Sequence, residues 1–236
     1  MARLDNYLVE NNLALSRNKA QGLIKDGLVS VNDKVIKKSS YKLESSDEVK
    51  VGEHKEYVSR SAFKLAYFLE ELDLDLKDKI ALDIGSSTGG FTQVLLEYDV
   101  AEISAVDVGK AQLHQILRDD NRVHSYESCD IREFKTDKEF DLVVSDVSFI
   151  SLHHILDDVH RLAKKNIILL FKPQFEVGRE AKRDSNGVVL DEKVIQKAML
   201  KFEDSCSLLG WKLVKKSASK LTGKEGNLEY CYFFEC

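Results

Sequence analysis

Proline, cysteine and long hydrophobic runs are scarce in this sequence. Its 236 residues include one proline and four cysteines, and no two cysteines form a Cys-x-x-Cys pair. This spacing favours reduced thiols over a disulfide framework or a zinc site, so no metal is expected. The longest apolar runs, such as residues 166–171, are far shorter than the roughly 20 residues needed to cross a bilayer. The N-terminus also lacks the apolar segment of a secretory signal, so a cytoplasmic protein is expected.

Charge is spread unevenly along the chain. The composition, 43% hydrophobic and 32% charged, is that of a globular protein, and the net charge is −5. Residues 1–42 nevertheless hold eight Lys or Arg against four Asp or Glu, a local balance of +4 that leaves −9 for the rest. A basic head on an acidic body indicates contact with a polyanion, although a solvated basic face is the alternative. The candidate residues for this contact are Arg3, Arg17, Lys19 and Lys25.

The first 52 residues are expected to form a small α+β domain. Leu4, Tyr7 and Leu8 fall on one helical face, and Ser16 is a candidate N-cap for a second helix that Gly27 ends. Polar residues then suggest a linker over 53–60. The β-like pieces of this domain are residues 28–31, 35–36 and 48–51, with a turn at 32–33.

The hydrophobicity pattern changes at Ile80, where short apolar runs begin to alternate with longer amphipathic stretches. This alternation predicts an α/β fold in which a parallel sheet is covered on both faces. Residues 211–214 and 230–234 could form a hairpin that closes one sheet edge. The expected strands are residues 80–84, 103–108, 142–144 and 167–171, and the expected helices are 152–163 and 193–209.

The strand that ends at Asp83-Ile84 runs into a glycine-rich turn and then a helix. Its spacing, G-x-x-x-G-G, differs from the G-x-G-x-x-G of dinucleotide binders, which makes a pyrophosphate cradle the less favoured ligand site. The backbone can approach a phosphate-free, cationic nucleoside such as S-adenosylmethionine, whose charge Asp83 would favour. The candidate cofactor residues are Asp83, Gly85, Ser86, Gly89, Gly90, Phe91 and Thr92.

Two further carboxylates follow in register. Asp107 ends the next strand and could accept both ribose hydroxyls, whereas Asp130 ends a further short stretch and could accept from the adenine amino group. Singly, Asp107 could be a helix N-cap and Asp130 a turn residue. With Asp83, the three together favour a nucleoside site.

Asp146 and Lys172 follow the next two strands, so both should face the crevice beside the glycine turn. Asp146 is therefore a candidate for the cofactor site as well as for catalysis. A partly buried lysine can have a pKa low enough to take the proton of a ribose hydroxyl, and a nearby carboxylate can orient it. The pair indicates methyl transfer to oxygen.

Five segments taken together resemble the TlyA family, whose members are rRNA cytidine 2′-O-methyltransferases with an FtsJ-like catalytic domain and are often named haemolysins. Residues 3–51 similarly resemble an RNA-binding fold named after a small-subunit ribosomal protein and shared with many pseudouridine synthases. The five segments are Tyr57–Leu65, Asp83–Thr92, Ser145–Phe149, Lys172–Glu176 and Gly226–Tyr230.

The resemblance implies a Rossmann-like class I methyltransferase fold, with a parallel-rich seven-stranded sheet, over residues 61–236. It implies S-adenosylmethionine as the methyl donor, ribosomal RNA as the substrate, and RNA contact by Arg60. The chain also begins and ends like the shorter members that act on 23S rRNA alone, so the large subunit is the expected partner. The implied catalytic tetrad is Lys64, Asp146, Lys172 and Glu229.

Four alternatives stay open at this point. A base N-methyltransferase is suggested by Asp146–Phe149, which loosely resembles an Asp-Pro-Pro-Tyr motif, but a lysine is a poor neighbour for an amine nucleophile. A pseudouridine synthase is suggested by Arg3-Leu4-Asp5, a triplet expected in the opening helix. A membrane-active haemolysin lacks a long basic amphipathic stretch. An RNA-binding protein without activity would need a broken cofactor site.

Overall fold

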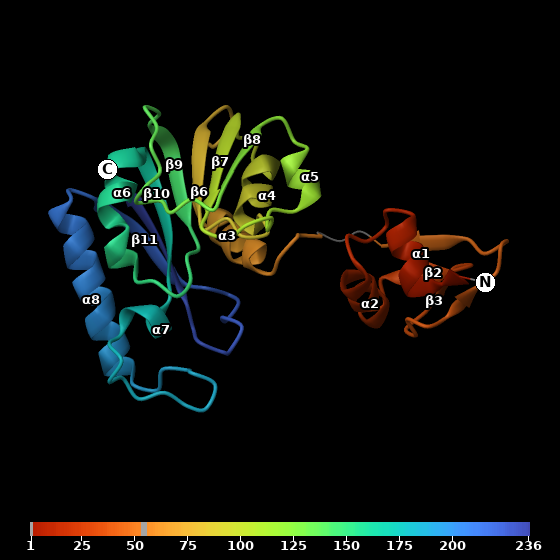
Figure 1. Ribbon diagram of the computed structural model, residues 1–236. Coiled ribbons are helices and arrows are strands. Elements are labelled where there is room, and N and C mark those ends of the chain that lie inside the picture. The colour runs from red at the N-terminus through yellow and green to blue at the C-terminus, as the bar shows by residue number, and fades with distance from the viewer. Residues whose placement is uncertain (1, 53–55) are drawn as a thin grey trace. The chain divides into compact units, whose positions relative to one another are not determined.

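The computed structural model describes residues 2–52 and 56–236, and the chain divides into two compact units, Met1–Glu56 and Tyr57–Cys236 (Figure 1). Residues 53–55 of the expected linker lie outside the described residues. Tyr57, which the sequence placed in that linker, is buried in the second unit. Its hydroxyl donates to Glu97, 3.0 Å away, and its ring meets Phe63 edge-on.

The first unit is a small α+β domain, as predicted. The Ser16 hydroxyl accepts from the Lys19 amide and caps the second helix, and Gly27 follows that helix with φ +78°. Asn32 and Asp33 both have positive φ, as a two-residue hairpin turn requires. The elements are β1 (Ala2–Arg3), α1 (Leu4–Glu10), α2 (Arg17–Lys25), β2 (Val29–Val31), β3 (Lys34–Val35), β4 (Lys42–Leu43) and β5 (Val49–Val51).

One core holds this unit together. The apolar faces of α1 and α2 pack against the sheet β3-β2-β5, in which all neighbours are antiparallel. The additional pair β1-β4 was not expected, because strands of two residues leave no alternating pattern to read. The fully buried members of the core include Leu4, Leu8, Ala20, Ile24 and Val29.

The second unit contains a seven-stranded sheet in the order β11-β12-β10-β9-β6-β7-β8. The pairs from β10 to β8 are parallel, and β12 runs antiparallel to both of its neighbours. The predicted Rossmann-like fold and the closing hairpin are therefore confirmed. The strands are β6 (Ile80–Ile84), β7 (Glu102–Asp107), β8 (Val123–Glu127), β9 (Phe140–Ser145), β10 (Ala163–Phe171), β11 (Lys212–Ala218) and β12 (Tyr230–Glu235).

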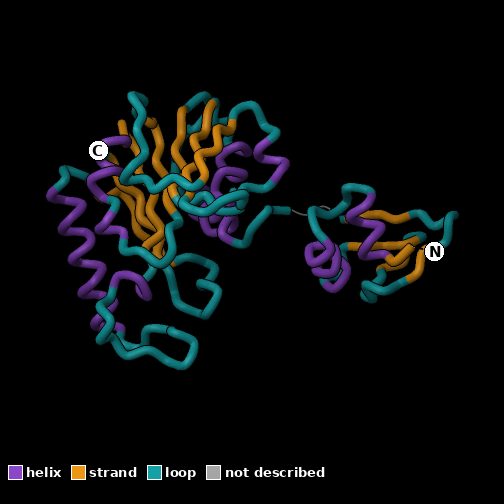
Figure 2. The backbone as a smooth tube through the Cα atoms, viewed as in Figure 1, coloured by secondary structure: helices purple, strands orange, loops and turns teal. Residues whose placement is uncertain are grey.

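Helices cover both faces of this sheet (Figures 1 and 2). The predicted helix 152–163 is wrong at both ends: its first turn is 3-10, and Ala163 already belongs to β10. The helical elements are α3 (Ser61–Leu69), α4 (Gly90–Glu97), α5 (Gln115–Arg118), η1 (Leu152–His154), α6 (Leu156–Leu162), α7 (Pro173–Glu176) and α8 (Glu192–Leu208).

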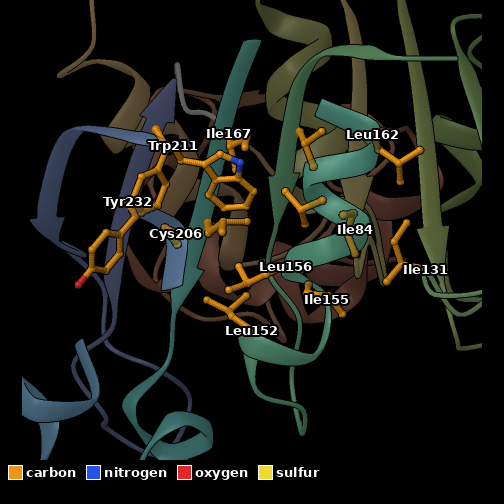
Figure 3. Close-up of a cluster of buried hydrophobic side chains, with 14 of the residues drawn as sticks. Ile84, Ile131, Leu152, Ile155, Leu156, Leu162, Ile167, Cys206, Trp211 and Tyr232 are labelled. Carbon is orange, nitrogen blue, oxygen red and sulfur yellow. The ribbon is translucent and has the colours of Figure 1, made fainter. Parts of the chain in front are cut away.

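Strand residues alternate between two hydrophobic cores, as side chains do on a pleated sheet. Ile84 and Ile167 face the core beneath α6 and α8, which also holds Trp211 (Figure 3). Ala81 and Ile168 face the opposite core, beneath α3 and α4. The central strands are thus apolar on both faces, and their carboxyl ends remain for polar side chains.

Candidate active site

A cavity of about 350 Å³ opens at the carboxyl ends of the parallel strands. Its walls come from the segments that follow β6, β7, β8 and β9, so residues far apart in sequence share one space. Gly85, Asp107, Asp130 and Asp146 all line it. Four of the predicted cofactor residues are therefore brought together around one cavity. The apolar part of the lining includes Ile84, Val106, Val108, Ile131, Val147 and Ile155.

Asp83 lies beneath the glycine turn and is fully buried. Its Oδ2 accepts from the Thr92 amide at 3.0 Å and from the Thr92 hydroxyl at 2.6 Å, which ties the end of β6 to the start of α4. Its Oδ1 is buried with no hydrogen-bond partner among the described residues. Burial raises the pKa of Asp83 to about 7, although the Thr92 hydroxyl opposes that shift. This carboxylate would be stabilised by a cation.

The other two carboxylates differ from each other. Asp107 accepts from the backbone amides of Ser87 (2.8 Å) and Gly109 (2.6 Å), so it also shapes the loops on either side of it. Asp130 lies three residues beyond the end of β8, not at its end as expected. The Arg132 guanidinium beside Asp130 lowers the pKa of that carboxyl and holds it at the cavity wall.

The glycines of the turn have different neighbours. A Cβ at Gly85 would meet the Val147 side chain at 3.0 Å, across the cavity wall. At Gly89 and Gly90, by contrast, a Cβ would meet Leu117 at 2.2 Å and the Ser59 hydroxyl at 2.1 Å. Gly89 and Gly90 are therefore required by packing within the domain, a reason that the sequence pattern did not disclose.

Lys172 and Asp146 form a buried ion pair. Lys172 is 7% exposed, and its Nζ lies 2.7 Å from Asp146 Oδ1 and 2.8 Å from the Ser148 hydroxyl. Burial raises the pKa of Asp146, and the charges of Lys172 and Lys64 oppose that shift. The two predicted partners are thus in direct contact at the ends of β9 and β10.

A second buried ion pair joins Lys64 and Glu229. Lys64 Nζ lies 2.5 Å from Glu229 Oε2, and Gln174 donates to Glu229 Oε1 at 3.2 Å. Lys64 is buried on α3, not exposed on its surface. All four residues of the predicted tetrad therefore occur as two ion pairs, and charges from both pairs act on Asp146.

A smaller cavity of about 150 Å³ lies beside the larger one. Ser59 and Ser61 line it together with the glycine turn, and Asp83 forms part of its wall. Asp146 and Ser148 border both cavities. Asp146 therefore lies where the two cavities meet, and Lys172 contacts it from outside their lining. Of the remaining turn residues, Ser86 and Phe91 line only the smaller cavity.

Two of the candidate RNA-binding residues of the first unit, Arg3 and Arg17, contact a buried carboxylate. Asp5 accepts from Arg3 (2.9 Å) and from Arg17 (3.0 Å), and Gln21 donates to the same group. Arg3 hydrogen-bonded to Asp5 holds the pKa of that carboxyl well below its usual range. Asp5 is 0% exposed, so its carboxylate is not placed to contact an RNA base as a pseudouridine synthase aspartate must. The expectation that Arg3-Leu4-Asp5 lies in the opening helix is wrong for Arg3, which belongs to β1, whereas Leu4 and Asp5 begin α1.

The remaining candidates are accessible side chains. Lys25 is exposed at the end of α2, Lys19 is half-buried in its first turn, and Arg60 is exposed directly before α3. Arg17 is also more than half exposed despite its contact with Asp5.

The sequence pattern of FtsJ-like methyltransferases matches residues 57–236, and that of the S4 domain matches residues 2–49. The 23S rRNA (cytidine-2′-O)-methyltransferase TlyA of Campylobacter jejuni is 45% identical over 97% of either chain. The protein belongs to the TlyA family of FtsJ-like methyltransferases. The predicted family and enzyme class are thereby confirmed.

Other TlyA relatives extend the likeness. The 16S/23S rRNA (cytidine-2′-O)-methyltransferase TlyA of Mycobacterium tuberculosis is 38% identical over 97% of this chain and 88% of its own. A solved structure named as a hemolysin from Streptococcus thermophilus shares 33% identity, with a TM-score of 0.73 over 99% of this chain and 88% of that one. Among the described residues, no helix is long and apolar enough to span a membrane.

Two polar residues of this TlyA-family site were missed from the sequence. Ser148 contacts Lys172, and Gln174 contacts Glu229. Both lie inside the segments that carried the resemblance, so their position was visible. Their contacts could not be predicted, because the residue type of a loop serine or glutamine does not indicate which side chain it will bind in the folded protein.

Proposed function

We propose that this TlyA-family protein transfers a methyl group from S-adenosylmethionine to the ribose 2′-hydroxyl of a cytidine in ribosomal RNA. The observation that carries the proposal is the contact of buried Lys172 with Asp146, the carboxylate that borders both cavities. A lysine there supports oxygen as the nucleophile over an exocyclic amine. The relatives named above as rRNA (cytidine-2′-O)-methyltransferases support the choice of substrate.

The residues present fit S-adenosylmethionine. The orphaned Asp83 Oδ1 lies beneath the glycine turn, where a positive charge would compensate it. Asp107 and Asp130 line the larger cavity, where they would hold the ribose and the adenine. Gly85, Ser86, Gly89, Gly90, Phe91 and Thr92 would shape the turn around the ligand. When bound, the cofactor supplies an electrophilic methyl group.

The protein's own residues would prepare the oxygen nucleophile. Lys172 Nζ, in its uncharged form, would take the proton of the 2′-hydroxyl, and Asp146 Oδ1 at 2.7 Å would stabilise the resulting ammonium. Lys64 and Glu229 would hold the substrate ribose and the lysine in line with the methyl group. Most of the rate gain would come from this positioning.

We further propose that residues 1–52 guide the enzyme to the large ribosomal subunit and that 61–236 perform the reaction. The match of the S4 pattern to residues 2–49 and the basic charge of the head support an RNA contact by Arg3, Arg17, Lys19 and Lys25, with Arg60 beside the catalytic domain. A ribosomal substrate would place this activity in the cytoplasm. The 45% identical relative, named for 23S rRNA, supports the large subunit.

The decisive experiment incubates the purified protein with methyl-labelled S-adenosylmethionine and unmodified large or small subunits. Labelled nucleosides are then identified after digestion. Label is expected on a cytidine ribose of the large subunit, and Lys172→Ala should abolish it while cofactor binding persists. Lys165→Ala, which removes an exposed lysine on β10, the strand that directly precedes Lys172, is the matched control and should retain activity. Label on a base, or equal labelling by Lys172→Ala, would contradict the proposal.

A further inference from the structure

Glu176, the last residue of α7, uses both carboxylate oxygens on one loop. The Ser151 hydroxyl donates to Oε2 at 2.5 Å, and the Leu152 amide donates to Oε1 at 2.8 Å. Some 24 residues of chain separate the partners. Burial raises the pKa of Glu176, and the two hydrogen bonds oppose that shift. A half-buried acid that loses hydration needs such partners, so the contact is built rather than incidental.

The loop that Glu176 holds is a wall of the cofactor cavity. Residues 146–150 and Ile155 line that cavity. Ser151 and Leu152, which donate hydrogen bonds to Glu176, lie between them in the chain. Ser151 also accepts from the His153 amide at 3.2 Å and so begins η1. Leu152 is buried in the core beneath this wall, close to Leu156 (Figure 3).

On its other side, Glu176 is fixed relative to Lys172. The short helix α7 starts directly after Lys172, and Pro173 restricts the backbone at its first position. The Phe175 amide donates to the Lys172 carbonyl at 2.9 Å. Because Lys172 Nζ reaches back to Asp146 and Ser148, the chain closes a ring: cavity wall, Glu176, α7, Lys172 and the wall again.

We propose that Glu176 is a positioning residue that sets the cofactor-cavity wall at a fixed distance from Lys172. It touches neither cavity, so it acts only through Ser151, Leu152 and the backbone of α7. The inference rests on the proposed function, in which the cavity holds the methyl donor and Lys172 faces the ribose. We call the hydrogen bonds from Ser151 and Leu152 to Glu176 the clasp. Loss of the clasp should weaken cofactor binding and slow methyl transfer together, because this one side chain links the cavity wall to the segment that carries Lys172.

The side-chain chemistry explains why a carboxylate suits this place. The Leu152 amide can only donate, and the Ser151 oxygen already accepts from His153, so its proton is free to be donated. A carboxylate therefore supplies one acceptor oxygen to each of these two donors. A glutamine would keep the hydrogen bond with Leu152 and could still donate to the second lone pair of Ser151. Glu176→Gln should thus retain most of the positioning.

The test compares Glu176→Ala, Glu176→Gln and Ser151→Ala with the wild type. Affinity for S-adenosylhomocysteine is measured by calorimetry, and kcat and KM are measured with ribosomal subunits. Glu176→Ala should weaken cofactor-product affinity at least tenfold and lower kcat at least tenfold, with the KM for RNA within twofold. Glu176→Gln should recover both within threefold, and Ser151→Ala should lie between. The matched control, Glu180→Ala, removes an exposed acid nearby and should change neither constant.

The value of kcat and the affinity for S-adenosylhomocysteine are expressed per folded molecule. A variant that only lowers the amount of folded protein therefore leaves both values unchanged. If Glu176→Ala keeps both within twofold of wild type, or if glutamine restores neither, the positioning role is overturned. Should the alanine variant not fold, the glutamine and Ser151→Ala variants decide by the same two constants. Wild-type labelling of a base would overturn the proposed function alone, since the affinity for S-adenosylhomocysteine still tests the clasp.

Discussion

Lys64 Nζ lies 2.5 Å from Glu229 Oε2, although 165 residues separate them in the chain. Lys64 belongs to α3, before the first strand of the large sheet, and Glu229 directly precedes β12, which the chain enters last. Both side chains are buried, at 10% and 3% exposure. The start and the end of the catalytic domain therefore meet at the proposed tetrad, which exists only when the whole sheet has formed.

This pair leads to a stability prediction. Lys64→Met should lower the free energy of unfolding by about 3–5 kcal/mol, because the Glu229 charge is left buried without its cation. The double variant Lys64→Met/Glu229→Gln should regain a large part of that stability, since no buried charge remains. Urea unfolding of the two singles and the double measures the coupling. Additive effects would show that the pair is not coupled in the folded state.

Asp83 should make stability depend on pH. Its pKa is raised to about 7 in the folded protein from 3.8, so between these values the folded state binds more protons than the unfolded state. Stability from this group is therefore full at low pH and falls as pH rises through about 4 to 7. The free energy of unfolding of Asp83→Asn minus that of the wild type should therefore increase by on the order of 4 kcal/mol between pH 4 and pH 8. Urea unfolding at both pH values checks this; a difference independent of pH would contradict it.

Gly90 should not tolerate a side chain. A Cβ there would meet the Ser59 hydroxyl at 2.1 Å, the Ser61 hydroxyl at 2.6 Å and the Ala62 amide at 3.0 Å. Gly90→Ala should destabilise the protein by about 1–3 kcal/mol, as overpacking of a filled site does. Gly178→Ala is the matched control, because nothing lies within 4 Å of its Cβ position. Thermal unfolding of both variants distinguishes packing from a general effect of replacing glycine.

The basic head should supply salt-dependent RNA affinity. Replacing Arg3, Arg17 and Lys19 by glutamine should weaken RNA binding and reduce the slope of log affinity against log salt by up to about 3, because each cation that no longer neutralises a phosphate lowers the slope by about one. Affinity for S-adenosylhomocysteine should stay unchanged. Removing three exposed charges from α8 instead, by replacing Lys193, Lys197 and Lys201, should leave the slope as it is. Equal slopes for both triple variants would show that the basic residues of the first unit are solvated and do not contact RNA.

Much of the fold was accessible from local sequence patterns. Residues 80–84 form a strand with the predicted bounds, and the cap at Ser16 and the turn at Asn32–Asp33 follow from residue preferences that act within a few positions. The strand β8 was less visible, because at the sheet edge only Val123 is buried and little apolar pattern results. The two-residue strands β1 and β4 left no pattern at all.

The sequence by itself determined the fold class, the family resemblance and the choice of candidate residues, because these depend on short-range patterning and motif spacing. Only the tertiary structure decided which residues touch. It paired Lys172 with Asp146 and Lys64 with Glu229, bound Arg3 and Arg17 to a buried carboxylate, and made Glu176 a clasp on a distant loop. The Lys172–Asp146, Lys64–Glu229 and Glu176–Leu152 contacts join residues 24 to 165 positions apart, and the strength of all these contacts depends on burial, which no local pattern encodes.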